Sequence, residues 1–152
     1  MGEVSELLRG QRVIALDTCV WIYHIEEHPD YKAITTAILA AVAKGRCRGI
    51  VSELTLMELV VAPFKQSRQD VADEYEALLS HFPHLDLIPI SRSILLGAAN
   101  LRAEHGIRTP DAIILATALQ SEASLVIGND REWVRVLKGD QLRYERIADL
   151  SA

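Results

Sequence analysis

The chain alternates short strand-like runs with helix-like segments almost from end to end. The strand-like runs are rich in Val, Ile and Leu, and they cover residues 12–16, 48–51, 85–90, 124–127 and 142–147. Strands that alternate with helices pair in parallel, and the helices between them cover both faces of the sheet. The pattern therefore predicts a three-layer α/β/α domain.

Capping residues and prolines set the expected ends of the helices. Ser52 is expected to cap a helix that stops at Pro63, and Thr109 is expected to cap a helix that starts with Pro110. Pro89 interrupts the third strand, which predicts that this strand lies at an edge of the sheet. After a short leader that could itself be helical, the expected helices are 18–25, 31–44, 53–61, 66–80, 91–105, 110–121 and 131–138.

One domain accounts for the whole chain, residues 1–152. No linker, internal repeat or low-complexity segment divides it. The longest apolar run, around residues 112–119, falls far short of the roughly 20 residues of a membrane-spanning helix. The N-terminus lacks the apolar segment of a secretory signal, and two cysteines, Cys19 and Cys47, are too few for a disulfide framework. We therefore expect a cytoplasmic protein with reduced thiols and no membrane contact.

The net charge argues against nucleic-acid binding by basic side chains alone. The chain has 16 Lys and Arg residues and 21 Asp and Glu residues, so its formal charge is −5. Proteins that hold nucleic acid by neutralising phosphates are usually basic. If this chain acts on a phosphodiester, a bound divalent metal is the obvious way to offset the repulsion.

Three aspartates stand where a ligand site is expected in such a sheet. Asp17 directly follows the first strand, Asp130 follows the fourth, and Asp111 lies in the first turn of the helix that begins at Pro110. Ligands of open α/β sheets collect at the carboxyl ends of the strands. Each aspartate also has an ordinary structural explanation, because acids are common at helix starts as caps or as partners of the helix dipole.

Glu58 is harder to explain by structure alone. It falls in the middle of the helix predicted over 53–61, and its neighbours on that helix include Leu54, Thr55 and Ala62. A solvent-exposed helix face is usually more polar than this. Glu58 is therefore a candidate for the same site as the three aspartates.

Four sequence segments around these acids resemble the PIN domain family. They are LDTCVWI around Asp17, LTLMELVVAP around Glu58, TPDAIILATAL around Asp111 and VIGNDREW around Asp130, and they occur in the family's order. The small single-domain members, the VapC-type toxins of bacterial and archaeal toxin–antitoxin pairs, are the most similar. Two positions depart from the family pattern: Cys19 replaces the usual Asn or Ser, and Gly128 replaces a hydroxyl residue.

The resemblance implies a fold, a reaction and partners. PIN domains have an α/β/α fold around a central, mainly parallel five-stranded sheet. They are metal-dependent nucleases, and the small toxins among them cleave RNA. A toxin of this kind would be held in check by a small antitoxin protein, and we expect a homodimer.

The implied site would hold Mg²⁺ or Mn²⁺ on four carboxylates and hydrolyse RNA with a metal-bound water. These hard cations prefer carboxylate and water oxygens, and carboxylates that repel one another are stabilised by the cation. Thr18 and Asn129 are candidates to orient water or substrate. The residues expected to bind the metal and catalyse the reaction are Asp17, Glu58, Asp111 and Asp130, and the arginines that could meet RNA phosphates are Arg12, Arg92, Arg108 and Arg131.

Three other site chemistries fit the sequence less well. His24 and His28 match the H-x-x-E-H pattern of a zinc site, but Pro29 ends that helix and no downstream acid is a clear third ligand. A haloacid-dehalogenase-type phosphatase needs a second Asp where Cys19 stands. A response-regulator receiver needs paired acids before the first helix and a Lys after the last strands, and neither is evident.

Three functions remain open. A VapC-like ribonuclease toxin is the leading hypothesis, an RNA-processing PIN nuclease is the second, and a non-catalytic PIN-like interaction module is the third. Retention of all four acids speaks against the third, because an unused acidic cluster is electrostatically unfavourable. Val20, Trp21 and Tyr23, together with the helix over 31–44, form either a docking surface or part of the core.

Overall fold

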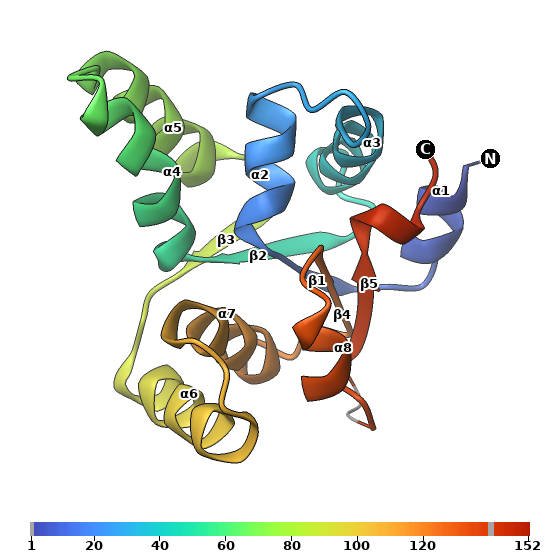
Figure 1. Ribbon diagram of the computed structural model, residues 1–152. Coiled ribbons are helices and arrows are strands. Elements are labelled where there is room, and N and C mark those ends of the chain that lie inside the picture. The colour runs from blue at the N-terminus through green and yellow to red at the C-terminus, as the bar shows by residue number, and fades with distance from the viewer. Residues whose placement is uncertain (1, 140–141) are drawn as a thin grey trace.

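The structure is a computed structural model that describes residues 2–139 and 142–152 (Figure 1). Its strands form one sheet in the order β3-β2-β1-β4-β5, and each neighbouring pair is parallel. The prediction of a mainly parallel five-stranded sheet is thus confirmed, and the sheet is parallel throughout. The strands are β1 (Val13–Leu16), β2 (Arg48–Ser52), β3 (Leu85–Ile88), β4 (Leu125–Gly128) and β5 (Arg143–Arg146).

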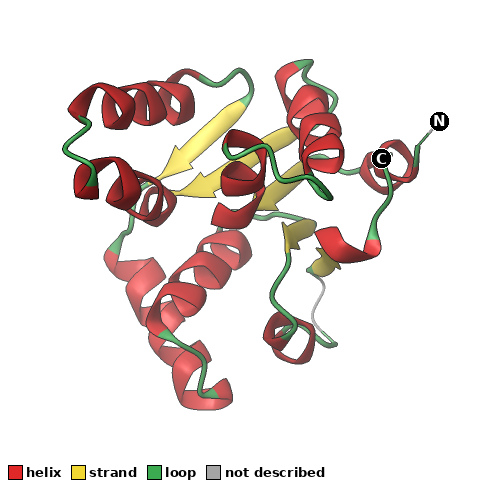
Figure 2. Ribbon diagram, turned by 45° about the horizontal axis from the view of Figure 1, so that its top comes forward, coloured by secondary structure: helices red, strands yellow, loops and turns green. Residues whose placement is uncertain are grey.

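Helices cover both faces of this sheet, as the alternating pattern predicts (Figures 1 and 2). One face carries α1, α2, α3 and α5, the other carries α6, α7 and α8, and α4 contributes to both cores. The helices are α1 (Glu3–Leu8), α2 (Thr18–Ile25), α3 (Lys32–Ala43), α4 (Glu53–Lys65), α5 (Gln69–His81), α6 (Arg92–His105), α7 (Thr109–Gln120) and α8 (Glu132–Val136), with a short 3-10 helix η1 (Ile147–Asp149).

The central strands β1, β2 and β4 are buried on both faces, so their side chains divide between two cores, whereas the edge strands β3 and β5 are partly buried. In β1, Ile14 and Leu16 pack with α1–α3, whereas Ala15 packs with α6 and α7. This division follows from the strand geometry, because successive side chains point to opposite faces. It explains why these strand sequences read as continuous apolar runs and not as alternating ones.

Within the described part of the chain, no helix is both long and apolar enough to cross a membrane.

The apolar face of α2 belongs to the core. Val20 and Trp21 have no exposed surface, and the Trp21 ring meets Phe82 edge-on with 5.3 Å between ring centroids. Tyr23 is partly buried against the same core. The docking-surface interpretation of Val20 and Trp21 is therefore wrong, because packing against the sheet already covers both side chains.

Two helix ends differ from the prediction. Helix α4 does not stop before Pro63 but continues to Lys65. Proline lacks only its own N–H, so it removes one backbone bond near the end of the helix, and its ring is buried in the fold. Helix α7 begins at Thr109 itself, and the cap position is Arg108, whose side chain makes no capping hydrogen bond.

The other caps are where the sequence places them. Ser52 Oγ accepts a hydrogen bond from the Leu54 N–H at 3.1 Å and so caps α4. Gly106 ends α6 with φ = +68°, a left-handed conformation that glycine adopts without strain. β3, with Pro89 just beyond it, lies at the edge of the sheet as predicted. The remaining elements lie where predicted, with ends shifted by a few residues.

Candidate functional site

Asp17 and Asp130 lie at the same edge of the sheet. Asp17 follows β1 directly, Asp130 follows β4, and these strands are neighbours. The pairing extends to the site itself, because the Asp17 N–H donates to the Ile127 carbonyl at 2.9 Å. A Cβ atom at Gly128 would lie 3.3 Å from the Asp17 Cβ and Oδ2 atoms and from the Trp133 ring. The departure from the family at Gly128 thus has a packing reason, since a side chain there would crowd Asp17.

Two buried threonines hold Glu58. The Thr18 hydroxyl donates to Glu58 Oε1 at 2.7 Å, and the Thr18 and Thr55 hydroxyl oxygens are 2.9 Å apart. Because Thr18 has one hydroxyl proton and gives it to Glu58, Thr55 must donate to Thr18. Thr18 is 5% exposed and Thr55 has no exposed surface, so water does not compete for these bonds. The chain Thr55–Thr18–Glu58 fixes the carboxylate of α4 to the start of α2.

Thr55 is a site residue that the sequence alone does not reveal as one. It lies three residues before Glu58, on the same side of α4, and the sequence presents it only as one of the less polar neighbours of that acid. The available signal is this helical spacing, but its meaning depends on Thr18, which arrives from another element. The fold brings the two hydroxyls together.

Asp17 is the most perturbed carboxylate of the site. Its pKa is raised from 3.8 to about 7, chiefly by burial and in smaller part by the negative charges of Glu58 and Asp111, although a 2.7 Å hydrogen bond from the Thr18 N–H opposes the rise. That same hydrogen bond caps α2, so the structural explanation for Asp17 is correct as well. The acid thus has a cap function and also lies beside two like charges.

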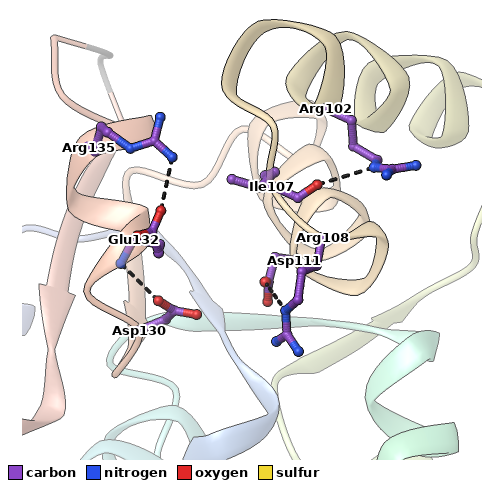
Figure 3. Close-up of polar contacts among 7 residues, drawn as sticks. All are labelled: Arg102, Ile107, Arg108, Asp111, Asp130, Glu132 and Arg135. Atoms are coloured by element: carbon purple, nitrogen blue, oxygen red, sulfur yellow. Dashed lines mark hydrogen bonds and ion pairs between the residues drawn. The ribbon is translucent and has the colours of Figure 1, made fainter.

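Asp111 and Asp130 project from facing segments, the start of α7 and the turn before α8 (Figure 3). Asp111 Oδ2 accepts from Arg108 Nε at 3.1 Å, and Asp130 Oδ1 accepts from the Glu132 N–H at 2.8 Å. Asp111, through its hydrogen bond and its charge, raises the pKa of Arg108, and the charges of Asp130 and Glu58 add to this effect. The four predicted acids therefore share one electrostatic environment, with Arg108 at its rim.

Tyr144 steadies the segment that carries Asp130. Its hydroxyl donates to the Asp130 carbonyl at 2.8 Å. Burial raises the pKa of the Tyr144 phenol, so the hydroxyl stays protonated and able to donate. The contact comes from β5 and has no counterpart in the local sequence around Asp130.

The chemistry of these donors fits a hard divalent cation. Every predicted ligand is a carboxylate, and among the ion pairs of the described residues none involves Asp17, Glu58 or Asp130. In the positions that the side chains occupy, however, no three His, Cys, Asp or Glu groups of the described chain are close enough to hold a metal ion. Asp111 and Asp130 each use one carboxylate oxygen for another partner, Arg108 and the Glu132 N–H, with which a cation would compete.

The Asn129 side chain is hydrogen-bonded to other parts of the fold, and Arg12 lies away from the four acids. The Asn129 amide donates to the Tyr23 hydroxyl at 3.2 Å and accepts from the Ala148 N–H at 3.0 Å, so it ties the β4–α8 turn to α2 and η1. Arg12 precedes β1 and lies at the amino end of the sheet, away from the carboxylates. The expectation that Arg12 borders the site is wrong, because a residue before a strand and one after it lie at opposite ends. Arg92 follows β3 and Arg131 follows β4, whereas Arg108 precedes α7 and pairs with Asp111, so these three arginines keep the predicted place.

The two histidines of the zinc pattern and the two cysteines have contacts that a structural role explains. His28 Nδ1 accepts from the Asp30 N–H at 3.1 Å, and its ring stacks on Tyr31 with 4.5 Å between centroids. His24 Nδ1 lies 3.3 Å from the Thr36 hydroxyl oxygen. Burial raises the pKa of both thiols, and for Cys19 the charge of Asp17 adds to the effect. Neither cysteine is therefore an activated nucleophile.

Comparison with known proteins gives one family and one fold. The family model described as "PIN domain" matches residues 14–138. No curated protein sequence matches significantly. A structure of VapBC2 from Rickettsia felis bound to a DNA fragment from its promoter is 22% identical, with a TM-score of 0.68 over 88% of this chain and 98% of that chain.

Two further solved structures are similar in fold. A toxin–antitoxin complex from Klebsiella pneumoniae is 24% identical, with a TM-score of 0.62 over 84% of this chain and 92% of that chain. FitAcB from Neisseria gonorrhoeae is 20% identical, with a TM-score of 0.65 over 90% of this chain and 99% of that chain. At these identities the likeness shows a shared fold.

Proposed function

The chain belongs to the PIN domain family, and on that premise we propose that it is a metal-dependent endoribonuclease that hydrolyses RNA phosphodiester bonds. The observation that carries the proposal is the gathering of Asp17, Glu58, Asp111 and Asp130 at the carboxyl edge of the sheet, with Asp17 largely buried beside two like charges. Such a group of carboxylates is unfavourable on its own and becomes favourable around a divalent cation.

The four acids are the residues that would hold Mg²⁺ or Mn²⁺. When bound, the cation supplies a nucleophilic water at neutral pH and neutralises charge on the phosphate. Thr18 and Thr55 keep Glu58 turned toward Asp17, and Tyr144 keeps the Asp130 backbone in place. Arg108, released from Asp111, would be free to meet an RNA phosphate beside the metal. Arg92 and Arg131 are the other candidates for phosphate contacts, and Asn129 is a candidate to orient water.

Within this function we favour a VapC-like toxin of a toxin–antitoxin pair. The support is the fold shared with a complex that is itself a toxin–antitoxin complex, and the small size of the chain. The proposal includes a small antitoxin as partner and a homodimer as assembly. We also expect a cytoplasmic protein, where the free thiols Cys19 and Cys47 would stay reduced. An RNA-processing PIN nuclease is the alternative, and a non-catalytic interaction module is the least favoured.

Cleavage of a labelled RNA by the purified protein tests the enzymatic proposal. We expect cleavage with Mg²⁺ or Mn²⁺, none in chelator, and none from Asp17→Asn with either metal. Asp73→Asn is the matched control, because Asp73 is an exposed aspartate on α5 that accepts a hydrogen bond from Gln69 and lies outside the site. Chelator-resistant cleavage, or cleavage by Asp17→Asn at the rate of the Asp73→Asn control, would exclude the proposed site.

Expression without a partner separates the toxin from a processing enzyme. The toxin should arrest growth when it is produced alone, and Asp17→Asn should relieve the arrest at equal protein level. A protein that cleaves RNA in vitro but leaves growth unchanged would favour RNA processing. A neighbouring reading frame for a short DNA-binding protein, able to bind the chain and block cleavage, would supply the expected antitoxin.

A further inference from the structure

A hollow lies at the amino end of the sheet, opposite the carboxylates. It has a volume of about 490 Å³, and its lining includes Gly10, Arg12, Gly45, Arg46, Arg48 and His84. A second hollow of about 310 Å³ shares Gly10 and Arg12 with it, and a third of about 440 Å³ shares Gly10 and Arg46. The three adjoin through these common residues and form one groove, which we call the basic groove.

Two short loops supply the charge of the basic groove. They are the segments 9–12, with sequence RGQR, and 44–48, with sequence KGRCR. Together they hold five of the 16 Lys and Arg residues of the chain and no Asp or Glu. In a chain with a net charge of −5, this is a strong local excess of positive charge. Gly10 and Gly45 turn the loops with φ of +79° and +75°, a conformation that suits glycine.

The strand register sets the two loops and His84 side by side. The Arg48 N–H donates to the Arg12 carbonyl at 2.8 Å, so the two loops are hydrogen-bonded where β1 and β2 begin. His84 stands immediately before β3, whose first residue pairs with Gly49 of β2. Arg12, Arg48 and His84 therefore lie side by side where three adjacent strands start, and neighbouring strands are roughly 5 Å apart.

Most of these cations have no acidic partner. All five Lys and Arg side chains of the two loops are exposed. Among the described residues, Arg48 forms an ion pair with Asp86, whereas Arg9, Arg12, Lys44 and Arg46 form none. Glu122 is the one carboxylate in the described lining of the three hollows. The basic groove thus presents uncompensated positive charge to solvent.

The lining also indicates how a ligand would be recognised. The described lining of the hollow of about 490 Å³ holds no aromatic side chain except His84 and no Leu, Ile, Val or Met, whereas Val4, Leu8 and three alanines line part of the hollow of about 440 Å³. Base stacking and protein–protein cores both depend on such side chains. Arginines with exposed donors instead match phosphate oxygens, which carry charge but no sequence information.

We propose that the basic groove binds the phosphate backbone of the RNA substrate at a distance from the cleaved bond. This inference rests on the proposed ribonuclease function in taking RNA as the polyanion. A strand anchored at the amino end of the sheet and cut at the carboxyl end must pass around the domain, so long RNAs gain contacts that short ones cannot make. Binding is independent of base sequence and sensitive to salt.

Helix ends give these cations a second, purely structural explanation. Lys44 and Arg46 follow the C-terminus of α3, where positive charge is favourable next to the helix dipole. Arg12 follows no helix end directly, because three residues and the turn at Gly10 separate it from α1. A pair of substitutions that includes Arg12 therefore distinguishes phosphate binding from helix stabilisation.

Anisotropy titrations with labelled RNA in chelator test the proposal, because no cleavage is expected there. The variants are Arg12→Ala/Arg46→Ala and a second groove pair, Arg9→Ala/Lys44→Ala. The matched control is Lys65→Ala/Arg68→Ala, two exposed cations at the α4–α5 corner that change the net charge equally. The probes are single-stranded RNAs of about 20 and about 5 nucleotides, which bracket the site sizes of single-strand-binding domains.

Both groove variants should bind the long RNA at least fivefold more weakly than the control. The slope of log K against log salt should also become shallower by about 1.4, the value for two lost phosphate contacts on a single strand. The proposal is overturned if both groove variants bind the long RNA as tightly as the control does. It is also overturned if only the affinity for duplex DNA of the same length is lost. A lower melting temperature with unchanged RNA binding assigns the cations to the helix ends instead.

Cleavage by the unmodified protein with Mn²⁺, measured in parallel, keeps the two hypotheses apart. If the protein cleaves RNA but its RNA binding does not depend on the basic groove, the groove proposal is wrong and the ribonuclease proposal stands. Groove-dependent binding without cleavage removes the ribonuclease and leaves the RNA-binding surface.

Discussion

Among the residues of the site, each carboxylate has a different partner. Asp17 accepts from a backbone N–H, Glu58 accepts from a hydroxyl, Asp111 pairs with an arginine and Asp130 caps a turn. Substitutions at the four acids and at their partners therefore have distinct expected outcomes.

The four acids should act as a unit in cleavage. We expect Asp17→Asn, Glu58→Gln, Asp111→Asn and Asp130→Asn each to reduce kcat/KM at least about 100-fold, since even residues behind a metal ligand cost 10- to 100-fold. Double substitutions should lose little more than single ones, because the acids serve one metal site. Losses that multiply in the double variants would show independent roles.

Thr18 should matter through the position of Glu58. Thr18→Val removes the hydrogen bond to Glu58 Oε1, and we expect about a 10- to 100-fold loss of Mn²⁺ affinity, as for other residues that orient metal ligands. Thr18→Ser keeps the hydroxyl and should restore most of the affinity. Thr55→Val, one step further away, should have a smaller effect in the same direction. Equal Mn²⁺ affinity in Thr18→Val and Thr18→Ser would contradict this role.

The raised pKa of Asp17 predicts a destabilised metal-free protein. Between pH 3.8, its ordinary value, and about 7, its value in the fold, the folded protein binds more protons at Asp17 than the unfolded chain does. The Asp17 contribution therefore lowers the free energy of unfolding as pH rises through this range, and the full penalty applies above about pH 7. Its upper limit is about 4 kcal/mol, at 1.36 kcal/mol per pKa unit.

Asp17→Asn should relieve this penalty and keep the helix cap, since Asn caps as well as Asp. In chelator at pH 8 we expect a Tm several degrees above that of the unmodified protein, because about 1 kcal/mol corresponds to 2–4 °C at this size. At pH 4 the difference should shrink, which thermal unfolding at both pH values would show. An Asp17→Asn protein that is less stable than the parent at pH 8 would mean that hydrogen bonding outweighs burial.

At the level of elements, α4 carries Glu58 and depends on its first turn. Ser52 is 3% exposed, and its hydroxyl satisfies the Leu54 N–H. Ser52→Ala should cost about 0.5–2 kcal/mol, or roughly 1–8 °C in Tm at this chain length. Ser80→Ala, at an exposed position of α5, is the control and should change Tm little. A Ser52→Ala protein with the Tm of that control would show that another group satisfies the N–H.

At the level of the whole molecule, charge is separated along the strands. Carboxylates occupy one end of the sheet, and the basic groove occupies the other. This separation reconciles a net charge of −5 with a nucleic-acid substrate, since the metal would neutralise one end and the cations of the groove would attract phosphates to the other.

Metal binding should stabilise the whole domain. Mn²⁺ at a concentration 100 times its Kd adds about 2.7 kcal/mol to the free energy of unfolding of a protein that binds it only when folded. We expect a clear increase in Tm for the unmodified protein and for the control Asp73→Asn, and little or none for Asp17→Asn. The His24→Ala/His28→Ala protein should shift like the parent. An equal Mn²⁺ shift in Asp17→Asn would place the metal elsewhere.

The sequence by itself determined the layered fold and the order of the strand and helix segments, and its resemblance to PIN domains nominated the four acids. These follow from local signals, namely apolar runs, caps such as Ser52 and acids placed after strands, and each signal lies within a few residues. The sequence predicted that α4 stops at Pro63, whereas the helix continues to Lys65, because burial of the proline ring offsets the one backbone hydrogen bond that the proline removes. It also placed Arg12 at the wrong end of the sheet and left open whether Trp21 belongs to a surface or to the core.

Only the tertiary structure decided the contacts between elements. Thr55 reaches Glu58 through Thr18, Tyr144 reaches Asp130 from β5, and Arg12 meets Arg48 across two strands. Each of these contacts joins residues that no local pattern links. The sheet register brings them within hydrogen-bonding distance, and that register is set by the packing of both cores at once.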